Sequence, residues 1–386
     1  TIRKNYERSV SRGSLKPDQL EQRMQDMDVG SESVFIGDMA MHELLVSLGV
    51  QPDVMLGHSS GESAALGACG ANPARTPDER AYCISRHFAV YEELLAAGKI
   101  PTGALLAVGA LPPATVESLV AQAGDVVVAM DNCGNQMVLY GTPEGIARVH
   151  GLLGKEGGIC LPLPFDRGYH TSAFSDVSTA FLQYYQDVKV GRPTIPLYSC
   201  ASADLFPSHP AAVRKLAAAQ WSRKVRFRET VLKMHDDGVR LFVEVGPSAK
   251  LTAFVNDILI DRDFVSVATN VRRKNDVEHL LAVLGQLYVA GRGPVLARLF
   301  EPRAIAAIDL DGPAPAPRGV LLDNTMPMLR LSIAERETLR KLAESPAPAR
   351  GEGGAHPQPQ GQTLAADGAG AEPGEDERAS VMATLS

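Results

Sequence analysis

The sequence predicts an α/β fold in which a small β-α-β-β-α-β unit interrupts a larger domain. Three observations lead to this prediction. A helical pattern over residues 34–49 is followed by a short apolar strand at Val54 to Leu56. Short segments between residues 103 and 163 alternate in the order of the small unit, and longer elements resume after residue 174. A chain of 386 residues is long enough for two or three such folded units.

The first part of the larger domain, residues 1–99, contains a sharp turn between a strand and a helix. The helical pattern ends at Gly49, and the strand after it runs into GHSSGESAALGACG, where small residues replace bulky ones. The stretch Thr76-Pro77-Asp78-Glu79 then supplies an N-cap, a proline for the first helical position and a capping glutamate. We therefore expect a helix from Pro77 to Ala97.

The interrupting unit, residues 100–165, has the element order of a ferredoxin-like fold. The larger domain resumes over residues 166–299, where we expect a parallel sheet with helices between its strands. The predicted segments of the unit are Gly103 to Gly109, Pro112 to Ala123, Val126 to Asp131, Gln136 to Gly141, Pro143 to Leu153 and Ile159 to Leu163. Those after it are a helix at Phe174 to Asp187, a strand at Ile195 to Ser199, a helix at Val225 to Asp237 and a strand at Leu241 to Val245.

The C-terminal part of the chain is predicted to lie outside the folded domain. Residues 300–345 contain a Pro-rich stretch and the segment LLDNTMPMLRLS, which indicates a strap lying on a domain surface. Residues 346–386 are rich in Gly, Pro and Ala, with no aromatic residue, and are predicted to be a disordered linker. This linker holds six acidic residues against two arginines, so it carries more than half of the net charge of −7.

Composition excludes several classes of protein. Hydrophobic residues make up 45% and charged residues 22%, as in ordinary globular chains, and no apolar run is long enough to span a membrane. The negative net charge argues against a nucleic-acid partner. Five cysteines without a C-x-x-C pair favour reduced thiols over disulfides or a zinc site, and so a cytoplasmic protein. The first residue is Thr1 and no signal sequence follows it, so we interpret the chain as a piece of a longer polypeptide.

A nucleophilic serine is the strongest candidate for chemistry. The run Gly57-His58-Ser59-Ser60-Gly61 matches the nucleophile elbow, in which glycines permit a strained turn that exposes the serine hydroxyl. The pattern alone is short, but the apolar strand before it and the Ala-rich helix after it fit the mechanics of the motif. The alternative is a small-residue turn required only for packing.

A serine nucleophile needs a base, and the chain has nine histidines. His170 differs from the others because LPLPFDRGYHTSAF places it after an apolar strand and before a helix, where active-site loops of α/β sheets gather. The spacing alone leaves open that His170 merely caps the helix after it.

Five motifs together resemble the malonyl-CoA:acyl carrier protein transacylase family. They are GHSSGE (57–62), NCGNQMVLYG (132–141), LPLPFDRGYH (161–170), QWSRKVRF (220–227) and EVGPSAKLTAF (244–254), in the order of that family. The resemblance extends over residues 32–299 and is closer still to the acyltransferase domains of type I polyketide synthases and polyunsaturated fatty acid synthases. It implies a hydrolase-like α/β large subdomain, a ferredoxin-like small subdomain, and transfer of an acyl group from coenzyme A to the phosphopantetheine thiol of a carrier protein.

The same resemblance implies roles for particular residues. Ser59 is similar to the acyl-accepting nucleophile, His170 to its general base, and the backbone N–H of Ser60 to an oxyanion-hole donor. Gln220 matches the position whose backbone carbonyl orients the histidine. Asp166 and Asp176 are the rival orienting groups, which we interpret as solvated charges.

The substrate-binding residues are expected to be Arg86, Tyr169 and His58. Arg86 lies on the capped helix, where the family holds the carboxylate of its substrate, and it is preferred over Arg80. The bulky Tyr169 before the histidine favours malonyl over branched extender groups. No metal or redox cofactor is implied.

The resemblance also implies binding partners, and two alternative functions remain beside it. A carrier domain, neighbouring synthase domains and coenzyme A are the expected partners. Coenzyme A and the carrier would favour a basic rim, for which Arg167, Arg223, Lys224, Arg226 and Arg228 are available, unless these are ordinary surface charges. The family's N-terminal Gly-Gln-Gly turn has no match here, which predicts a missing strand and a missing oxyanion donor. A hydrolase and a non-catalytic scaffold are the alternative functions.

Overall fold

The computed structural model describes residues 27–74, 76–272, 274–301 and 331–344. The chain divides into two compact units, with residues 27–301 in the first and residues 331–344 in the second. Among these residues, no helix combines the length and apolar composition needed to cross a bilayer. The predicted N-terminal missing strand and the predicted linker over residues 346–386 lie outside the described residues, as does most of the predicted strap.

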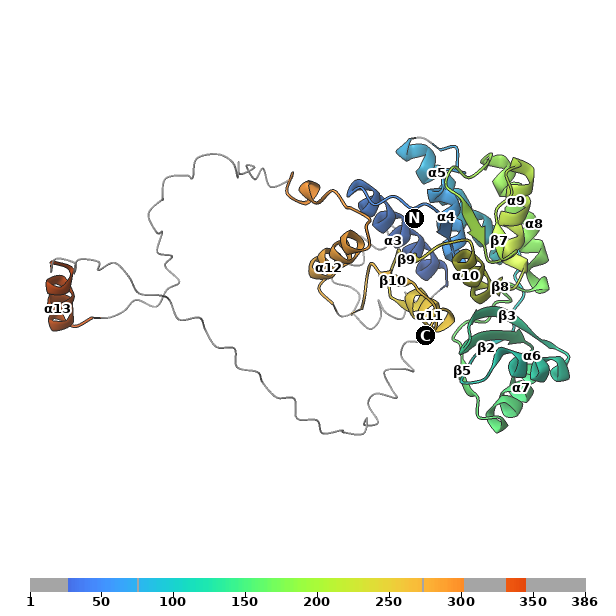
Figure 1. Cartoon of the computed structure of the whole chain (residues 1–386). Helices are drawn as coiled ribbons and strands as arrows, with labels where there is room; N and C mark the ends of the chain where they lie inside the picture. Colours follow the sequence, from blue (N-terminus) through green and yellow to red (C-terminus); the bar gives the residue numbers. More distant parts are fainter. Residues whose placement is uncertain (1–26, 75, 273, 302–330, 345–386) are drawn as a thin grey trace. The chain divides into compact units, whose positions relative to one another are not determined.

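The first part of the large domain is a set of helices around a short strand (Figure 1). Helix α3 (Met27–Ser47) leads to β1 (Met55–Leu56), α4 (Ser60–Ala68) and α5 (Pro77–Ala96). Helix α5 begins as the sequence predicts, because Thr76 accepts a hydrogen bond from the N–H of Glu79 and the Glu79 carboxylate accepts one from the N–H of Thr76. Helix α3 begins earlier than the predicted residue 34.

The inserted segment forms an antiparallel sheet covered by two helices (Figure 1). Its order is β2 (Ala104–Gly109), α6 (Pro113–Ala123), β3 (Val126–Cys133), β4 (Gln136–Gly141), α7 (Pro143–Lys155) and β5 (Ile159–Pro162), as predicted. The strands lie in the order β5-β2-β4-β3, and β8 (Val225–Arg226) from the large domain joins the edge of β3 in parallel. Leu106, Leu139, Val149 and Leu153, all fully buried, belong to the core between the strands and α7.

The large domain resumes after this segment. A 3₁₀ turn (Ser172–Phe174) precedes α8 (Ser175–Asp187), and then follow β6 (Leu197–Ser199), β7 (Asp204–Leu205), α9 (Pro210–Ala219) and the 3₁₀ turn Gln220–Ser222. After β8 come α10 (Phe227–Asp236), β9 (Leu241–Glu244), α11 (Lys250–Ile258), β10 (Val265–Ala268), α12 (Asp276–Val289), the 3₁₀ turn Leu296–Leu299 and, in the second unit, α13 (Ile333–Glu344).

The large domain contains parallel pairs of strands, as predicted, and the described residues do not join these pairs into one sheet. Strands β1 and β6 pair in parallel, as do β9 and β10. The described residues nevertheless form separate sheets, and β7 joins β6 in antiparallel orientation. One hydrophobic core of the large domain includes Phe174, Phe181 and Leu197, whose side chains are almost wholly buried. The fold is therefore a mixed α/β fold with short strands.

Candidate active site

The turn from β1 to α4 is strained at Ser59. This residue has φ 53° and ψ −119°, a conformation that non-glycine residues rarely adopt. Gly57 makes the turn possible, because a Cβ at this position would lie 2.2 Å from the backbone nitrogen of Glu62. A Cβ at Gly61 would meet only an ordinary contact, so only the first glycine of the motif is required sterically. The turn thus has the geometry that the motif predicts.

Buried hydrogen bonds hold α4 against the end of β6. Glu62 is 3% exposed, and its carboxylate accepts hydrogen bonds from the Ser199 hydroxyl at 2.7 Å and the Cys200 N–H at 3.2 Å. Burial raises the pKa of Glu62 to about 7, while these two hydrogen bonds act in the opposite direction. The helix behind the serine is therefore anchored to the parallel pair β1 and β6.

The structure brings Ser59 and His170 together from positions 111 residues apart in the chain. His170 is buried and also has a positive φ of 61°. Its Nδ1 lies 2.8 Å from the backbone carbonyl oxygen of Gln220, and its Nε2 lies 2.8 Å from the Ser59 hydroxyl. Because a carbonyl oxygen can only accept, Nδ1 carries the proton and Nε2 is free to accept from the serine.

Burial also keeps the imidazole of His170 neutral. It lowers the pKa of His170 to about 4, against an opposing effect of the hydrogen bond to Gln220, and nearby His58 lowers it further. Asp166 and Asp176, the rival orienting groups, are both exposed. The arrangement is a hydroxyl, a neutral base and a carbonyl that fixes the tautomer of the base.

Ser60 is the first residue of α4, directly after the serine. The first N–H groups of an α-helix have no acceptor inside the helix, and the helix dipole favours negative charge there. The N–H groups of the next two residues are already used: Gly61 donates to the carbonyl of His58 at 2.9 Å, and Glu62 to that of Ser59 at 3.0 Å.

Tyr169 and Arg86, both expected at the substrate, are placed differently. Tyr169 is 8% exposed, its hydroxyl lies 2.8 Å from that of Tyr91 on α5, and its ring centroid lies 4.9 Å from that of Phe174. Arg86 instead forms an ion pair with Glu93 at 2.8 Å, and both side chains are substantially exposed. The helical repeat directs Cys83, His87 and Tyr91 inward and Arg86 to the flank of α5, and the predicted role of Arg86 at the substrate stays a prediction.

His58, the third expected substrate-binding residue, is half-buried and held by two contacts. Its Nε2 lies 2.7 Å from the side-chain oxygen of Asn132 on β3, and its ring packs against that of Phe227 at a centroid distance of 5.3 Å. Asn132 was not among the residues predicted for the site. The motif NCGNQMVLYG contains it, but nothing in the pattern indicates which of its polar residues contacts His58.

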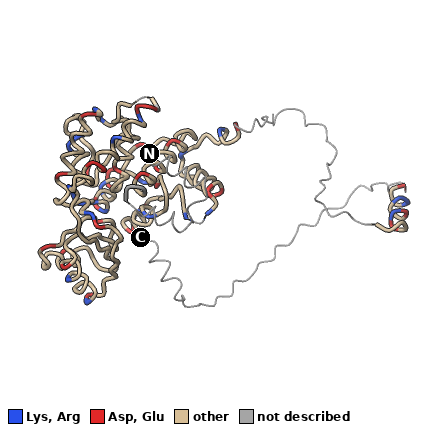
Figure 2. Tube along the Cα trace, turned by 180° about the vertical axis from the view of Figure 1, so that it is seen from behind, with Lys and Arg blue, Asp and Glu red and all other residues tan. Residues whose placement is uncertain are grey.

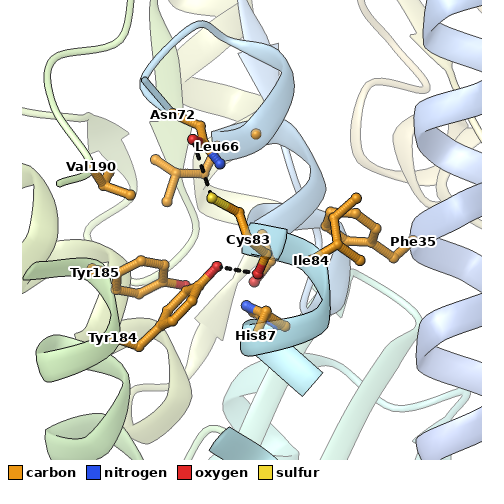
Figure 3. A pocket seen from close by; sticks show the side chains of 11 residues that line it. Phe35, Leu66, Asn72, Cys83, Ile84, His87, Tyr184, Tyr185 and Val190 are labelled. Carbon is orange, nitrogen blue, oxygen red and sulfur yellow. Dashed lines mark hydrogen bonds between the residues drawn. The ribbon is translucent and has the colours of Figure 1, made fainter. Parts of the chain in front are cut away.

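A small cavity lies between α4, α5 and α8 (Figure 3). Its volume is about 40 Å³, which is room for about two or three water molecules. Residues of α4, α5 and α8 line it, including Ser63, Leu66, His87 and Tyr184. Neither Ser59 nor His170 belongs to the lining, and the volume is too small for an acyl-thioester substrate.

The predicted basic rim is largely neutralised. Figure 2 shows positive and negative residues interspersed along the chain. Four of the five predicted rim residues form ion pairs with carboxylates, so they do not make a free cationic surface. These pairs are Arg167 with Asp166, Lys224 with Glu117, Arg226 with Glu229, and Arg228 with Asp131.

Comparison with known proteins identifies the family. The family model described as the acyl transferase domain matches residues 14–294, most of the chain. The chain belongs to the acyltransferase family. This confirms the resemblance inferred from the five motifs, and it makes the Ser59–His170 pair part of an acyltransferase domain.

Several members of the acyltransferase family are similar to this chain. 6-Methylsalicylic acid synthase of Penicillium patulum is 28% identical over 67% of the chain, and malonyl CoA-acyl carrier protein transacylase of Bacillus subtilis is 27% identical over 57%. The chain spans 14% of the first protein and 69% of the second. A polyunsaturated fatty acid synthase polypeptide of Thraustochytrium sp. is 29% identical over 64% of the chain, which spans 9% of that protein.

Solved structures of acyltransferases have the same fold. The acyltransferase domain from the second module of the salinomycin polyketide synthase superposes with a TM-score of 0.63 at 24% identity, covering 74% of this chain and 66% of that one. MCAT from Streptococcus pneumoniae superposes with a TM-score of 0.58 at 26% identity, covering 69% and 84%.

Proposed function

We propose that the chain loads an acyl group from coenzyme A onto Ser59 and then passes it to the phosphopantetheine thiol of an acyl carrier protein. The observation that carries the proposal is the line of contacts from the Ser59 hydroxyl through His170 to the Gln220 carbonyl, each 2.8 Å long. In an acyltransferase, such a pair can accept and then release an acyl group in a ping-pong cycle.

Proton movement in this cycle is assigned to His170. Its Nε2 takes the Ser59 proton as the oxygen attacks the thioester carbonyl, and the oxyanion that forms lies near the N–H of Ser60. Collapse breaks the carbon–sulfur bond, and the imidazolium returns its proton to the departing thiolate. The carrier thiol then gives its proton to His170 and attacks the carbonyl of the acyl-serine. As the bond from the acyl carbon to the Ser59 oxygen breaks, the imidazolium returns this proton to Ser59. The coenzyme A thioester and the carrier's phosphopantetheine supply all that these steps need, without a metal or redox cofactor.

We further propose malonyl as the preferred acyl group. The ring of Tyr169, directly before His170, is fixed by its hydroxyl contact with Tyr91 and by packing against Phe174. A ring that cannot move aside would exclude a methyl branch at the α-carbon, an effect of about 1–3 kcal/mol.

A malonyl carboxylate needs a cation, and we propose Arg167 for this role as the alternative to the predicted Arg86. Its side chain is 23% exposed, and its partner Asp166 is an exposed neighbour in sequence. Burial raises the pKa values of Tyr91 and Tyr169, and the positive charge of Arg167 opposes the rise at both. The guanidinium is therefore close to the two phenols beside His170, and it can exchange Asp166 for a substrate carboxylate.

We expect Arg167→Ala to lower the ratio of malonyl to acetyl loading by about 10- to 100-fold. This range corresponds to the loss of about 1.5–3 kcal/mol, the usual contribution of a hydrogen bond to a charged group. The measurement is the initial rate of each acyl transfer from coenzyme A at saturating carrier. The matched control is Arg86→Ala, for which the ratio should stay within about twofold of the parent. The reverse result, a loss of preference with Arg86→Ala alone, would return the role to Arg86.

The proposed function is tested by incubating the 386-residue chain with malonyl-CoA and following its mass with and without a carrier protein. An added acyl mass that is stable alone and moves to the carrier supports the transferase. Rapid loss of this mass to water would make the protein a hydrolase, and no added mass would make it a scaffold.

The proposal also includes the partners and the domain organisation of the chain. We propose that its partners are a carrier domain and neighbouring synthase domains. We interpret the mixed α/β fold as a hydrolase-like subdomain and a ferredoxin-like subdomain. All five cysteines are free thiols, which supports a cytoplasmic location.

A further inference from the structure

One contact joins the five-stranded sheet directly to the turn that holds the serine. Asn132 lies near the end of β3 and is 3% exposed. Its side-chain oxygen accepts a hydrogen bond from Nε2 of His58 at 2.7 Å, across 74 residues of sequence. His58 directly precedes Ser59, so the contact reaches the backbone of the nucleophile through a single side chain.

The orientation of Asn132 is set by a second contact on its other side. The amide nitrogen of Asn132 donates to the side-chain oxygen of Gln136, which can only accept. The oxygen of Asn132 therefore faces His58, and Nε2 of His58 must carry a proton. Burial lowers the pKa of His58, while the hydrogen bond to Asn132 opposes this change, so the ring is neutral in this contact.

The His58 backbone is in turn part of the strained turn. Its carbonyl accepts the Gly61 N–H at 2.9 Å at the start of α4, and Ser59 beside it has the positive φ of 53°. A strained conformation persists only where its surroundings hold it, and here the surroundings include a ring fixed at its Nε2 and packed on Phe227. Movement of the ring would shift the Ser59 hydroxyl relative to Nε2 of His170.

Resting on the proposed function, we propose that Asn132 is a positioning residue for the acyl transfer. By holding His58 in place, it aligns the Ser59 hydroxyl with His170 and makes this alignment depend on the docking of the five-stranded sheet. Asn132 itself touches neither the hydroxyl nor the base in the structure. Its effect is on geometry, which in enzymes is worth as much as 10²-fold for a misplacement of about 1 Å.

The titratable groups beside Asn132, on α4 and at position 170 are each hydrogen-bonded or neutral. Asp131, next to Asn132, is held by two hydrogen bonds from the Arg228 guanidinium at 2.9 and 2.7 Å. Glu62 of α4 is hydrogen-bonded to the end of β6, and His170 is neutral. A new carboxylate at position 132 would therefore act mainly on the two imidazoles, and it would raise the pKa of both.

The matched control comes from the same β-hairpin. Asn135 donates a side-chain hydrogen bond to Asp257 on α11, so it also joins the sheet to the large domain, but it does not touch His58. Asn135→Ala thus removes an exposed contact of the same residue type between the sheet and the large domain. It controls for the loss of an asparagine contact at this end of the sheet, and the Asn132→Asp variant controls for the burial of position 132.

The experiment measures acyl loading from malonyl-CoA as a function of pH for the parent chain, Asn132→Ala, Asn132→Asp and Asn135→Ala, with circular dichroism to establish folding. We expect Asn132→Ala to slow loading at saturating malonyl-CoA about 10- to 100-fold with a nearly unchanged KM, and Asn135→Ala to stay within about twofold of the parent. Asn132→Asp keeps the acceptor, so it should recover most of the rate at neutral pH and move the acidic limb of the pH profile to higher pH.

Three results would overturn the proposal: an Asn132→Ala rate within about twofold of the parent, an equal loss in Asn135→Ala, or an Asn132→Asp variant that is slow with an unmoved acidic limb. If Asn132→Ala does not fold, the proposal is tested by the loading rate of Asn132→Asp and by the position of the acidic limb in its pH profile. A parent chain that takes up no acyl group would instead contradict the proposed function, which separates the two failures.

Discussion

Replacing Ser59 by alanine is expected to abolish acyl loading, with a fall in rate of at least about 10⁴-fold. The hydroxyl is the group that lies 2.8 Å from Nε2 of His170, and an alanine leaves no oxygen to form the acyl ester. The variant should still fold, because the strain of the turn depends on its backbone and on Gly57 rather than on the hydroxyl. The measurement is the mass of the intact protein after incubation with malonyl-CoA, followed by the mass of the peptide that contains residue 59.

Ser85→Ala is the matched control for this prediction, since Ser85 is exposed on α5 and removing its hydroxyl changes no contact with the site. It should load at the parent rate. Acyl mass that persists in Ser59→Ala, on any other peptide, would move the nucleophile elsewhere in the chain.

The contact between Ser59 and His170 could be predicted because each residue depends on local backbone geometry that leaves a mark in the sequence. Gly57 is required by the close approach of Glu62, and small residues mark the turn into α4. His170 follows a strand and precedes a helix, and the structure gives it the positive φ typical of a tight connection. The resemblance added the carbonyl of Gln220, which no side-chain pattern could reveal because a backbone group acts there.

The charges around the site could not be predicted, because their partners are distant in sequence or lie along one helix. Arg228 pairs with Asp131 across 97 residues, and Arg86 pairs with Glu93 two turns along α5. Composition shows that these residues are charged, but only the fold shows that each is already engaged. The same limit explains why Asn132 was missed, since its partner His58 is 74 residues away.

The way in which the strands of the large domain pair could also not be predicted from the sequence. Apolar runs predicted β1, β6 and β9 in nearly the right places, whereas β10, the parallel partner of β9, was not predicted. The reversal at β7 depends on a turn through Ser202 and Ala203, where Ala203 has a positive φ of 53°. No glycine marks this turn, so the sequence gives no sign of it.

Replacing His170 by alanine is the second change with a large expected effect, about 10²- to 10⁴-fold in loading rate from the loss of general base catalysis. The parent should show an acidic limb, because only the neutral imidazole can accept the Ser59 proton. Burial lowers the pKa of His170 to about 4 from its ordinary value of 6.5, so the base stays competent as the pH falls and is lost only near pH 4. The residual rate of His170→Ala should lack this limb. A limb near 6.5 in the parent would indicate a solvated base and contradict the buried position of His170.

Acid unfolding has to be separated from this limb, because the same lowered pKa values destabilise the folded protein. Loss of solvation lowers the pKa values of His170 and His87 to about 4, so below about pH 6.5 the unfolded chain binds their protons more readily than the folded one does. These two histidines therefore lower the folding stability as the pH falls from about 6.5 toward about 4, whereas Glu62 and Asp38, whose pKa values burial raises to about 7, act in the opposite direction over the same range. Circular dichroism at each pH gives the folded fraction, and His150→Ala, at an exposed position of α7, should reproduce both the rate and the limb of the parent. A limb that follows the folded fraction in every variant would assign the pH dependence to unfolding and remove the argument for His170 as the base.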